Sequence, residues 1–211
     1  MKSALRTLSI VPFFVLAAGA AHAQSSNWYM GGSLGVTRFT FADDSLPISG
    51  AANTLLNKDD ESSTGGRVFG GYRFARNFAV EAGLTDFGSF AATRTLIPAT
   101  GSAHAELKIV GLHGAAVGIL PIDNKFELFG KAGLLFSSTQ YTRSASGNVG
   151  LTGDTTTYHG DASFLLGFGA EFHIDRNFGV RVEYEDAFGV GDSSVASGDL
   201  SFASVGVTYR F

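Results

Sequence analysis

The sequence predicts an all-β fold, a closed barrel of eight antiparallel strands, and three observations lead to this prediction. A short phrase recurs at residues 74–81 (FARNFAVE), 122–129 (IDNKFELF) and 174–181 (IDRNFGVR), with spacings of 48 and 52 residues. Apolar and polar side chains alternate along the segments that flank each copy, which is the period of a β-strand. Short turns alternate along the chain with long polar connections.

Each copy of the phrase predicts two strands joined by a turn. The central residues of the copies, 75–77, 123–125 and 175–177, are of types that favour three-residue hairpin turns. Three hairpins supply six strands, and one strand before and one after them bring the number to eight. The predicted strands span residues 28–41, 64–74, 78–91, 106–122, 126–142, 159–174, 178–190 and 199–211. The long connections that remain are residues 42–63, 92–105, 143–158 and 191–198, which are rich in Ser, Thr, Gly, Asn and Asp.

Residues 1–23 have the pattern of a removable export signal. Lys2 and Arg6 precede an apolar stretch at residues 8–21, and the chain continues into a small-x-small cleavage site, Ala21-His22-Ala23. The apolar stretch is shorter than the roughly 20 residues that a membrane-spanning helix needs. We therefore expect a signal peptide at 1–23, export by the Sec route and a mature barrel domain of residues 24–211. A helical anchor that stays attached is the alternative.

The composition narrows the classes of function. Charged residues make up 16% of the chain, against about 25% in soluble domains. Without Lys2 and Arg6, 13 of the 15 basic residues remain against 19 acidic ones, a formal charge of −6, and this acidic balance argues against nucleic acid as a partner. The sequence has no Cys, which excludes disulfides, Cys-ligated metal sites and a thiol nucleophile.

The alternation alone leaves open which face of each strand lies inside, because a soluble sandwich with an inward apolar face also alternates. Three features favour an apolar face that meets lipid. The polar face is rich in Gly and Ala, as a narrow lumen requires, and aromatic residues of the apolar face gather near the short turns as in an interfacial girdle. The sequence also stops on Phe211 at the end of a strand. The predicted fold class is therefore an eight-stranded antiparallel up-and-down transmembrane β-barrel, closed because an open edge in lipid would leave backbone groups unpaired.

The same register predicts charged side chains inside the barrel. If Phe178 pairs with Ile174 across its turn, Glu171 stands opposite Arg181; the equivalent registers place Gly71 opposite Glu81 and Val117 opposite Lys131. Unpaired buried charges cost several kcal/mol, so these groups must pair with one another. A structural plug of ion pairs is the preferred interpretation, and a gate whose partners switch is the alternative. The expected interior charge network consists of Glu81, Lys131, Glu171, Arg181 and Glu183.

Two features fit this register less simply. The inward residues of the strand at 106–122 are mostly apolar, which indicates either a dry lumen or a register that is off by one. These residues are Ile109, His113, Ala115, Val117 and Ile119. Asp86 and Asp186 fall on the lipid-facing side near the long loops, so either they lie above the hydrocarbon or a β-bulge resets the face.

Several segments resemble the transmembrane domain of the OmpA family. They are residues 28–36 (WYMGGSLGV), 68–83 (VFGGYRFARNFAVEAG), 128–133 (LFGKAG) and 169–184 (GAEFHIDRNFGVRVEY). The terminal VGVTYRF is also similar to the ending of small OmpX/Ail-type barrels. The resemblance implies that the barrel-assembly machinery reads Tyr209 and Phe211, and that Glu81, Lys131, Glu171 and Arg181 occupy the positions of the family's interior charge network. Larger family members carry a periplasmic domain that binds peptidoglycan, and this sequence ends at the barrel, so that function is not expected of it.

The resemblance implies a structural barrel in the outer membrane, sometimes with weak channel activity and often with surface contacts through its loops. We expect a protein that supports envelope integrity and presents surface loops; the alternatives are a small passive porin and a loop-mediated adhesin or receptor. The expected partners are outer-membrane lipid, the barrel-assembly machinery and an external ligand of the loops.

Neither an enzyme nor a cofactor is expected. A catalytic site would need a nucleophile and a base close together near the outer rim, but His159 and Ser163 stand about 13 Å apart along one strand. The acidic residues of the first long connection could bind a divalent cation, although a solvated acidic loop is the preferred interpretation, so no metal site is assigned. These residues are Asp43, Asp44, Asp59, Asp60 and Glu61.

Overall fold

The computed structural model describes residues 27–41, 54–57, 62–96, 101–147, 155–190 and 198–211. The predicted signal peptide and the acidic residues of the first connection lie outside these ranges, and both stay predictions. Within the described ranges, no helix is long and apolar enough to cross a membrane.

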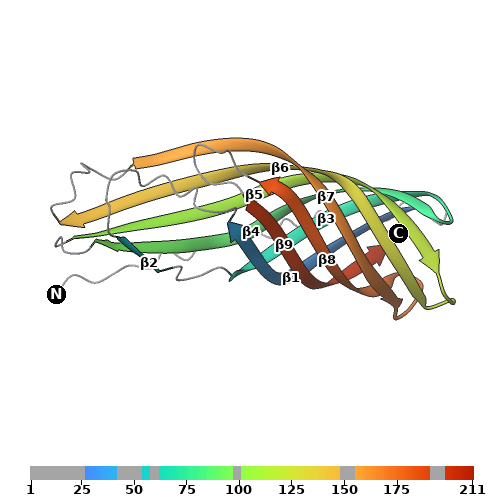
Figure 1. The fold of residues 1–211 in the computed structure, drawn as a ribbon. Helices are drawn as coiled ribbons and strands as arrows, with labels where there is room; N and C mark the ends of the chain where they lie inside the picture. Colours follow the sequence, from blue (N-terminus) through green and yellow to red (C-terminus); the bar gives the residue numbers. More distant parts are fainter. Residues whose placement is uncertain (1–26, 42–53, 58–61, 97–100, 148–154, 191–197) are drawn as a thin grey trace.

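Nine strands are present in the described part of the chain (Figure 1). They are β1 (Trp28–Phe41), β2 (Thr54–Asn57), β3 (Ser62–Ala75), β4 (Phe78–Leu96), β5 (Gly101–Pro121), β6 (Phe126–Gly147), β7 (Thr155–His173), β8 (Phe178–Val190) and β9 (Gly198–Arg210). Eight of them correspond to the predicted strands. The prediction is wrong for β2, which falls in the predicted loop 42–63. It also makes four strands several residues too short at the long-loop end, because it ends β4 and β6 too early and begins β5 and β7 too late.

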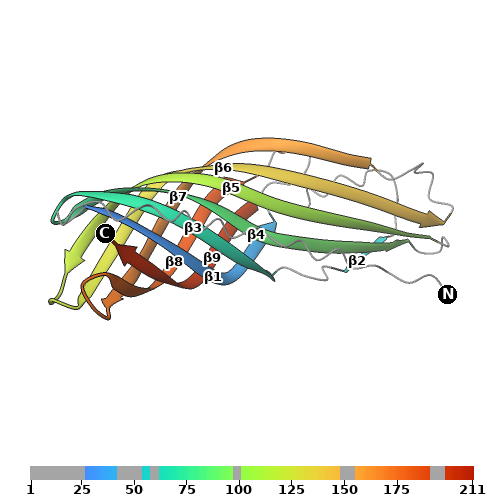
Figure 2. The ribbon, with the colours of Figure 1, turned by 180° about the vertical axis from the view of Figure 1, so that it is seen from behind.

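The eight long strands form a closed antiparallel barrel. Going around it, the neighbours are β1, β3, β4, β5, β6, β7, β8 and β9, and β9 pairs again with β1 from Tyr29↔Arg210 to Phe41↔Gly198. Every long strand therefore has a backbone partner on both sides over its barrel portion, which a structure surrounded by lipid requires. This topology confirms the predicted up-and-down barrel (Figure 2).

One side of the barrel is much taller than the other at the long-loop end. The strands β4 to β7 have 19 to 22 residues, whereas β1, β3, β8 and β9 have 13 or 14. Figures 1 and 2 show the long strands β4 to β7 running past the ends of the other four. The short β2 exists because this extension leaves the edge of β4 open, and it pairs there from Thr54↔Leu96 to Asn57↔Thr93.

Two of the three predicted three-residue turns are confirmed. The N–H of Ile122 donates to the carbonyl of Phe126 at 3.0 Å, and the N–H of Ile174 donates to that of Phe178 at 2.9 Å. In the second of these turns the Asp175 carboxylate accepts hydrogen bonds from the N–H groups of Phe178 and Asn177, which lower the pKa of Asp175.

The predicted turn at 75–77 is wrong in length. Ala75 belongs to β3 and pairs with Phe78, so that Arg76 and Asn77 alone form a two-residue turn. A register irregularity between Tyr72 and Ala75 absorbs the difference. Beyond this irregularity the register is the predicted one, with Gly71 opposite Glu81. The predicted pairing of Glu171 with Arg181 between β7 and β8 is also present.

The two faces of the wall differ sharply in chemistry. On β8, Val182 is 51% exposed on the outer face, whereas its neighbours Arg181 and Glu183 are 4% and 7% exposed and point into the lumen. The same alternation runs around the barrel, so large apolar side chains cover its outside and the ionised groups lie inside. This is the predicted inverted arrangement, in which the outer face meets hydrocarbon.

Inward-facing glycines make room for the large side chains of the lumen. A Cβ added at Gly71 would collide with the ring of Tyr29, and one added at Gly169 would lie 2.5 Å from Cζ of Phe129. The glycines of the polar face are therefore a packing requirement of a narrow barrel, as their frequency predicts.

Two bulges change which residues face inward near the long-loop end. Gly88 and Gly189 have φ angles of +84° and +67°, which glycine adopts without strain. Gly88 borders one register shift and Gly189 lies within another. Phe87 and Phe90 of β4 consequently both lie inside. A bulge follows Asp86 but does not turn it inward, because Thr85 and Phe87 on either side of it are both buried. The Asp86 carboxylate accepts a hydrogen bond from the N–H of Gly88 at 2.9 Å.

The strand at 106–122 has the predicted register, with Val117 opposite Lys131. Ile109, His113 and Ala115 are buried on its inner face, and Ile119 is partly buried. The apolar inner face of β5 is thus a real feature of the lumen and not an error of register.

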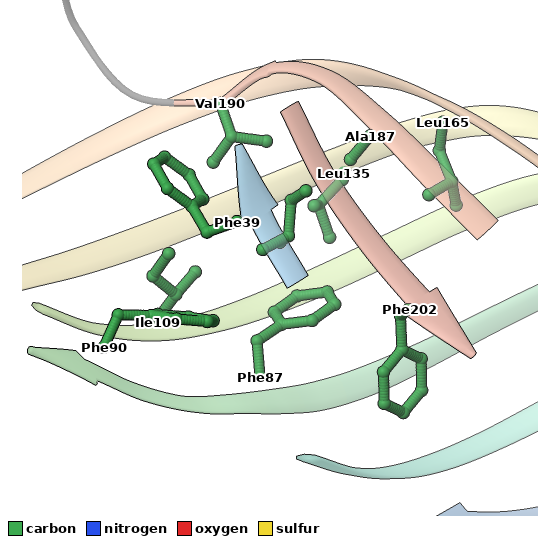
Figure 3. Packing of buried hydrophobic residues seen from close by; sticks show 10 residues of the cluster. Phe39, Phe87, Phe90, Ile109, Leu135, Leu165, Ala187, Val190 and Phe202 are labelled. Carbon is green, nitrogen blue, oxygen red and sulfur yellow. The ribbon is translucent and has the colours of Figure 1, made fainter. Parts of the chain in front are cut away.

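Two apolar clusters pack inside the barrel at different levels. The first, which we call the outer apolar layer, lies at the long-loop end (Figure 3). It consists of Phe39, Phe87, Phe90, Ile109, Leu135, Leu165, Ala187, Val190, Leu200 and Phe202. The second, which we call the aromatic collar, lies nearer the short turns and consists of Tyr29, Phe69, Ala79, Val117 and Phe129.

Candidate functional site: the charge network of the lumen

Ionised side chains fill the lumen between the two apolar clusters. On β6 the inward residues follow one another as Phe129 of the collar, Lys131, Gly133 and Leu135 of the outer layer. The charges around Lys131 form what we call the central charge cluster. It consists of Arg67 of β3, Glu81 of β4, Lys131 of β6, and Arg181, Glu183 and Glu185 of β8, all of them buried.

Glu81 is the hub of the central cluster. Its Oε2 accepts hydrogen bonds from NH1 of Arg181 at 2.8 Å and from the hydroxyl of Tyr29 at 3.1 Å, while its Oε1 lies 3.4 Å from Nζ of Lys131. His113 approaches the same Oε1 with Nε2 at 3.7 Å. Two cations, the hydroxyl of Tyr29 and the ring of His113 therefore surround one buried carboxylate, as its desolvation requires.

The outer half of the cluster is held by the carboxylates of β8. Lys131 forms ion pairs with both Glu183 and Glu185. Arg67 also pairs with Glu185, lies 3.6 Å from Glu183 and donates from Nε to the hydroxyl of Thr85 at 2.9 Å. Arg67 and Glu185 were not among the predicted network residues, although both occupy inward positions of the same alternation that identified the others.

Arg181 joins the central cluster to the aromatic collar. Its guanidinium carbon lies 4.0 Å from the centre of the Phe129 ring and 4.9 Å from that of Phe69. Aromatic faces attract a desolvated cation, so the collar stabilises the guanidinium where the carboxylates leave space. The Nε of Arg181 lies 3.7 Å from Glu171 Oε2, which continues the network toward the short turns.

A second group of charges lies at the short-turn end, and we call it the mouth cluster. Glu127 accepts hydrogen bonds from Arg73 and Arg210, each at 3.0 Å, and Arg210 also reaches Glu171 at 3.2 Å. His173 lies between the two carboxylates, 3.4 Å from Glu127 and 3.5 Å from Glu171. The two carboxylates and the two arginines border a cavity of about 180 Å³ that reaches inward as far as Arg181.

The two clusters together are balanced in formal charge when the histidines are neutral. Their five cations are Arg67, Arg73, Lys131, Arg181 and Arg210, and their five carboxylates are Glu81, Glu127, Glu171, Glu183 and Glu185. Balance matters here because a single unpaired charge inside a protein costs several kcal/mol. The arrangement can lock strands together across the lumen.

The structure brings Glu81, Lys131, Glu171, Arg181 and Glu183 together in one connected network. Tyr209 and Phe211 lie elsewhere, at the short-turn end of the outer wall, with their rings 5.1 Å apart and Phe178 equally close to Tyr209. The hydroxyl of Ser163 donates to the carbonyl of Gly189 at 3.5 Å, and the side chain of His159 is outside the described residues. Among the side chains that the structure describes, no group of three or more His, Asp or Glu residues could hold a metal ion.

A closed barrel with an apolar outer wall and an ion-paired lumen defines a membrane β-barrel protein. Comparison with known families then gives the family: the model of the OmpA-like transmembrane domain matches residues 23–211, and the chain belongs to this family. The protein is accordingly an outer-membrane protein of the Gram-negative type.

Two curated relatives are each named outer membrane protein A. The relative from Serratia marcescens is 25% identical over 215 residues, which cover 100% of this chain and 56% of the relative. The one from Yersinia pseudotuberculosis is 25% identical over 211 residues, which cover 97% of this chain and 53% of the relative. The chain thus spans about half the length of the curated relatives that it matches.

Solved structures show the same fold. OprG from Pseudomonas aeruginosa superimposes with a TM-score of 0.59 at 14% identity, covering 89% of this chain and 96% of that one. Neisserial surface protein A gives a TM-score of 0.58 at 13% identity, covering 88% of this chain and 98% of that one. At such identities the likeness concerns the fold alone.

The network predicts a strong dependence of stability on Lys131. Lys131→Met leaves Glu81, Glu183 and Glu185 short of one cation, and we expect the free energy of unfolding to fall by about 3–5 kcal/mol. In Lys131→Met/Glu185→Gln the charges balance again, and most of the loss is recovered. Urea unfolding of protein refolded into lipid vesicles measures both values.

Lys125→Met is the matched control, because Lys125 is exposed in a short turn. Its effect should stay within about 0.5 kcal/mol. A double variant as unstable as Lys131→Met would contradict the proposed charge balance.

Proposed function

We propose that this protein is a structural barrel that supports the integrity of the outer membrane and presents surface loops. The observation that carries the proposal is the filled lumen. Moving along the axis from the short turns, the mouth cluster, the aromatic collar, the central charge cluster and the outer apolar layer follow one another. A protein built to conduct solutes needs a continuous wet path. The cavity at the short-turn end reaches only as far as Arg181, and the central charge cluster and the outer apolar layer occupy the axis beyond it.

The ion pairs contribute to the structural role by joining distant strands. Glu81 of β4 bonds Arg181 of β8, and Arg73 of β3 bonds Glu127 of β6. Such bonds connect opposite sides of the wall through the lumen. They therefore resist ovalisation of the barrel, which backbone pairing between neighbouring strands does not oppose directly. The proposal assigns the protein no catalytic activity and no cofactor.

The main alternative, a small passive porin, differs in one measurement. Purified protein in planar bilayers should give no discrete single-channel steps, and a strain that lacks the gene should become more sensitive to detergents and leak periplasmic enzymes. Lys131→Met/Glu185→Gln, which keeps the lumen filled, should restore the strain as the unaltered protein does. Regular steps from the unaltered protein, or a strain without any envelope defect, would overturn the structural assignment.

We further propose that Tyr209 and Phe211 form the signal that the barrel-assembly machinery reads. Both rings lie on the outer wall at the end of β9, the strand that closes the barrel onto β1. Phe211→Ser should lower the amount of assembled barrel in cells several-fold, and refolding of the purified chain in vitro should be unchanged. Equal losses in both settings would mean that the ring serves stability alone.

A second function, adhesion or ligand binding through the loops, is supported by the tall side of the barrel. The extension of β4 to β7, with β2 paired to its edge, is a sheet that rises beyond the level where the other strands end. A structural barrel does not require such an extension, whereas a protein that contacts another surface gains reach from it.

Deletion of residues 42–61 tests this second function, since it removes β2 and the acidic connection and leaves β3 complete. Binding of bacteria to a host-cell or abiotic surface should be lost while the protein still shows heat-modifiable gel migration. Unchanged binding by the folded deletion variant would exclude this connection as the adhesive element.

A further inference from the structure

The outer apolar layer lies on the long-loop side of every residue of the central charge cluster. On β8, Ala187 of the layer is the next inward residue after Glu185. On β4, Phe87 comes three inward positions beyond Glu81. An ion that enters from the long-loop end therefore meets apolar side chains before it meets any ion pair of the cluster.

The layer spans the whole cross-section of the barrel. Its ten residues come from seven of the eight barrel strands, and each is at most 2% exposed (Figure 3). The eighth strand, β3, contributes Gly65 at this level, and a Cβ added there would lie 3.1 Å from the ring of Phe202. The Phe202 ring thus fills the place that a β3 side chain would occupy.

Aromatic contacts hold the layer together. The rings of Phe39 and Phe90 have centroids 5.9 Å apart, and Phe87 meets Phe202 edge-on at 5.8 Å. The two bulges place Phe90 and Val190 inside, at positions that strict alternation would turn toward lipid. The positive φ angles of Gly88 and Gly189 therefore let these two strands add apolar side chains to the layer.

We propose that the outer apolar layer is a barrier to water and ions in its own right, in series with the ion-pair network below it. Its side chains offer an ion no replacement for its hydration shell, and a narrow apolar constriction blocks passage by dewetting. Rearrangement of ion pairs alone therefore does not open the barrel. This inference rests on the proposed structural function and places the barrier to conduction in two separate levels.

A two-by-two set of variants tests the series arrangement in planar bilayers. Glu81→Ala/Arg181→Ala opens the network where it meets the collar and removes one charge of each sign, so the balance is kept. Phe39→Ala/Phe90→Ala opens the layer and touches no residue of the charge clusters. Each pair alone should leave the barrel without single-channel steps, and the four substitutions together should produce them.

A second way of opening the layer guards against variants that do not fold. Leu165→Asn/Leu200→Asn makes the layer polar with the same number of side-chain heavy atoms. Combined with Glu81→Ala/Arg181→Ala, it should also produce single-channel steps. Leu165→Met/Leu200→Met, which keeps the layer apolar, should stay silent in the same combination. Heat-modifiable gel migration shows which proteins are folded before conductance is measured.

The outcomes separate this inference from the proposed function. Steps from the unaltered protein would refute the structural function itself. A silent unaltered protein together with a conducting Glu81→Ala/Arg181→Ala variant would show that the outer layer is no barrier. Conduction after opening the layer alone, or silence of both folded combined variants, would likewise overturn the series arrangement.

Discussion

The structure depends on one constraint, the need of every backbone N–H and C=O group in lipid for a partner within the protein. An open sheet cannot meet it, so β9 returns to β1 and the wall closes. Closure at eight strands leaves a lumen about as wide as two opposed side chains. The apolar face then has to turn outward, and the interior has to be filled by whatever side chains the inward positions carry.

The charged part of the interior consists of matched groups because an unpaired charge there would cost several kcal/mol. Five cations and five carboxylates of the two clusters pair across the lumen. The guanidinium of Arg181 also packs against the aromatic rings of Phe69 and Phe129. Small residues such as Gly71 and Gly169 provide the space for the rings of the collar. An apolar layer packs across the other end, so the lumen changes character along its axis.

Much of this arrangement follows from alternation counted outward from the turns. That count places Glu171 opposite Arg181 and Val117 opposite Lys131, because each strand keeps its period of two up to the bulges. It fails where the period is interrupted. The bulges at Gly88 and Gly189 carry Phe90 and Val190 inside, and a single sequence does not reveal that these two glycines take positive φ angles.

Other differences arise from tertiary pairing. β2 forms because the extension of β4 offers an open edge. The residue pattern of 54–57 alone does not predict a strand. Arg67 and Glu185 occupy inward positions that alternation does identify, but their membership of the network depends on which strands face each other across the lumen. The proposed role of Tyr209 and Phe211 in assembly comes from the family resemblance, and alternation along the strands does not indicate it.

The inverted arrangement of the wall can be measured directly with brominated lipids, because the chain has a single Trp at position 28. In a Trp28→Phe background, Phe168→Trp places the fluorophore on the outer wall and Phe129→Trp places it in the collar. Bromine on the acyl chains should quench the first strongly and leave the second almost unchanged. Strong quenching at position 129 with little at position 168 would contradict the account.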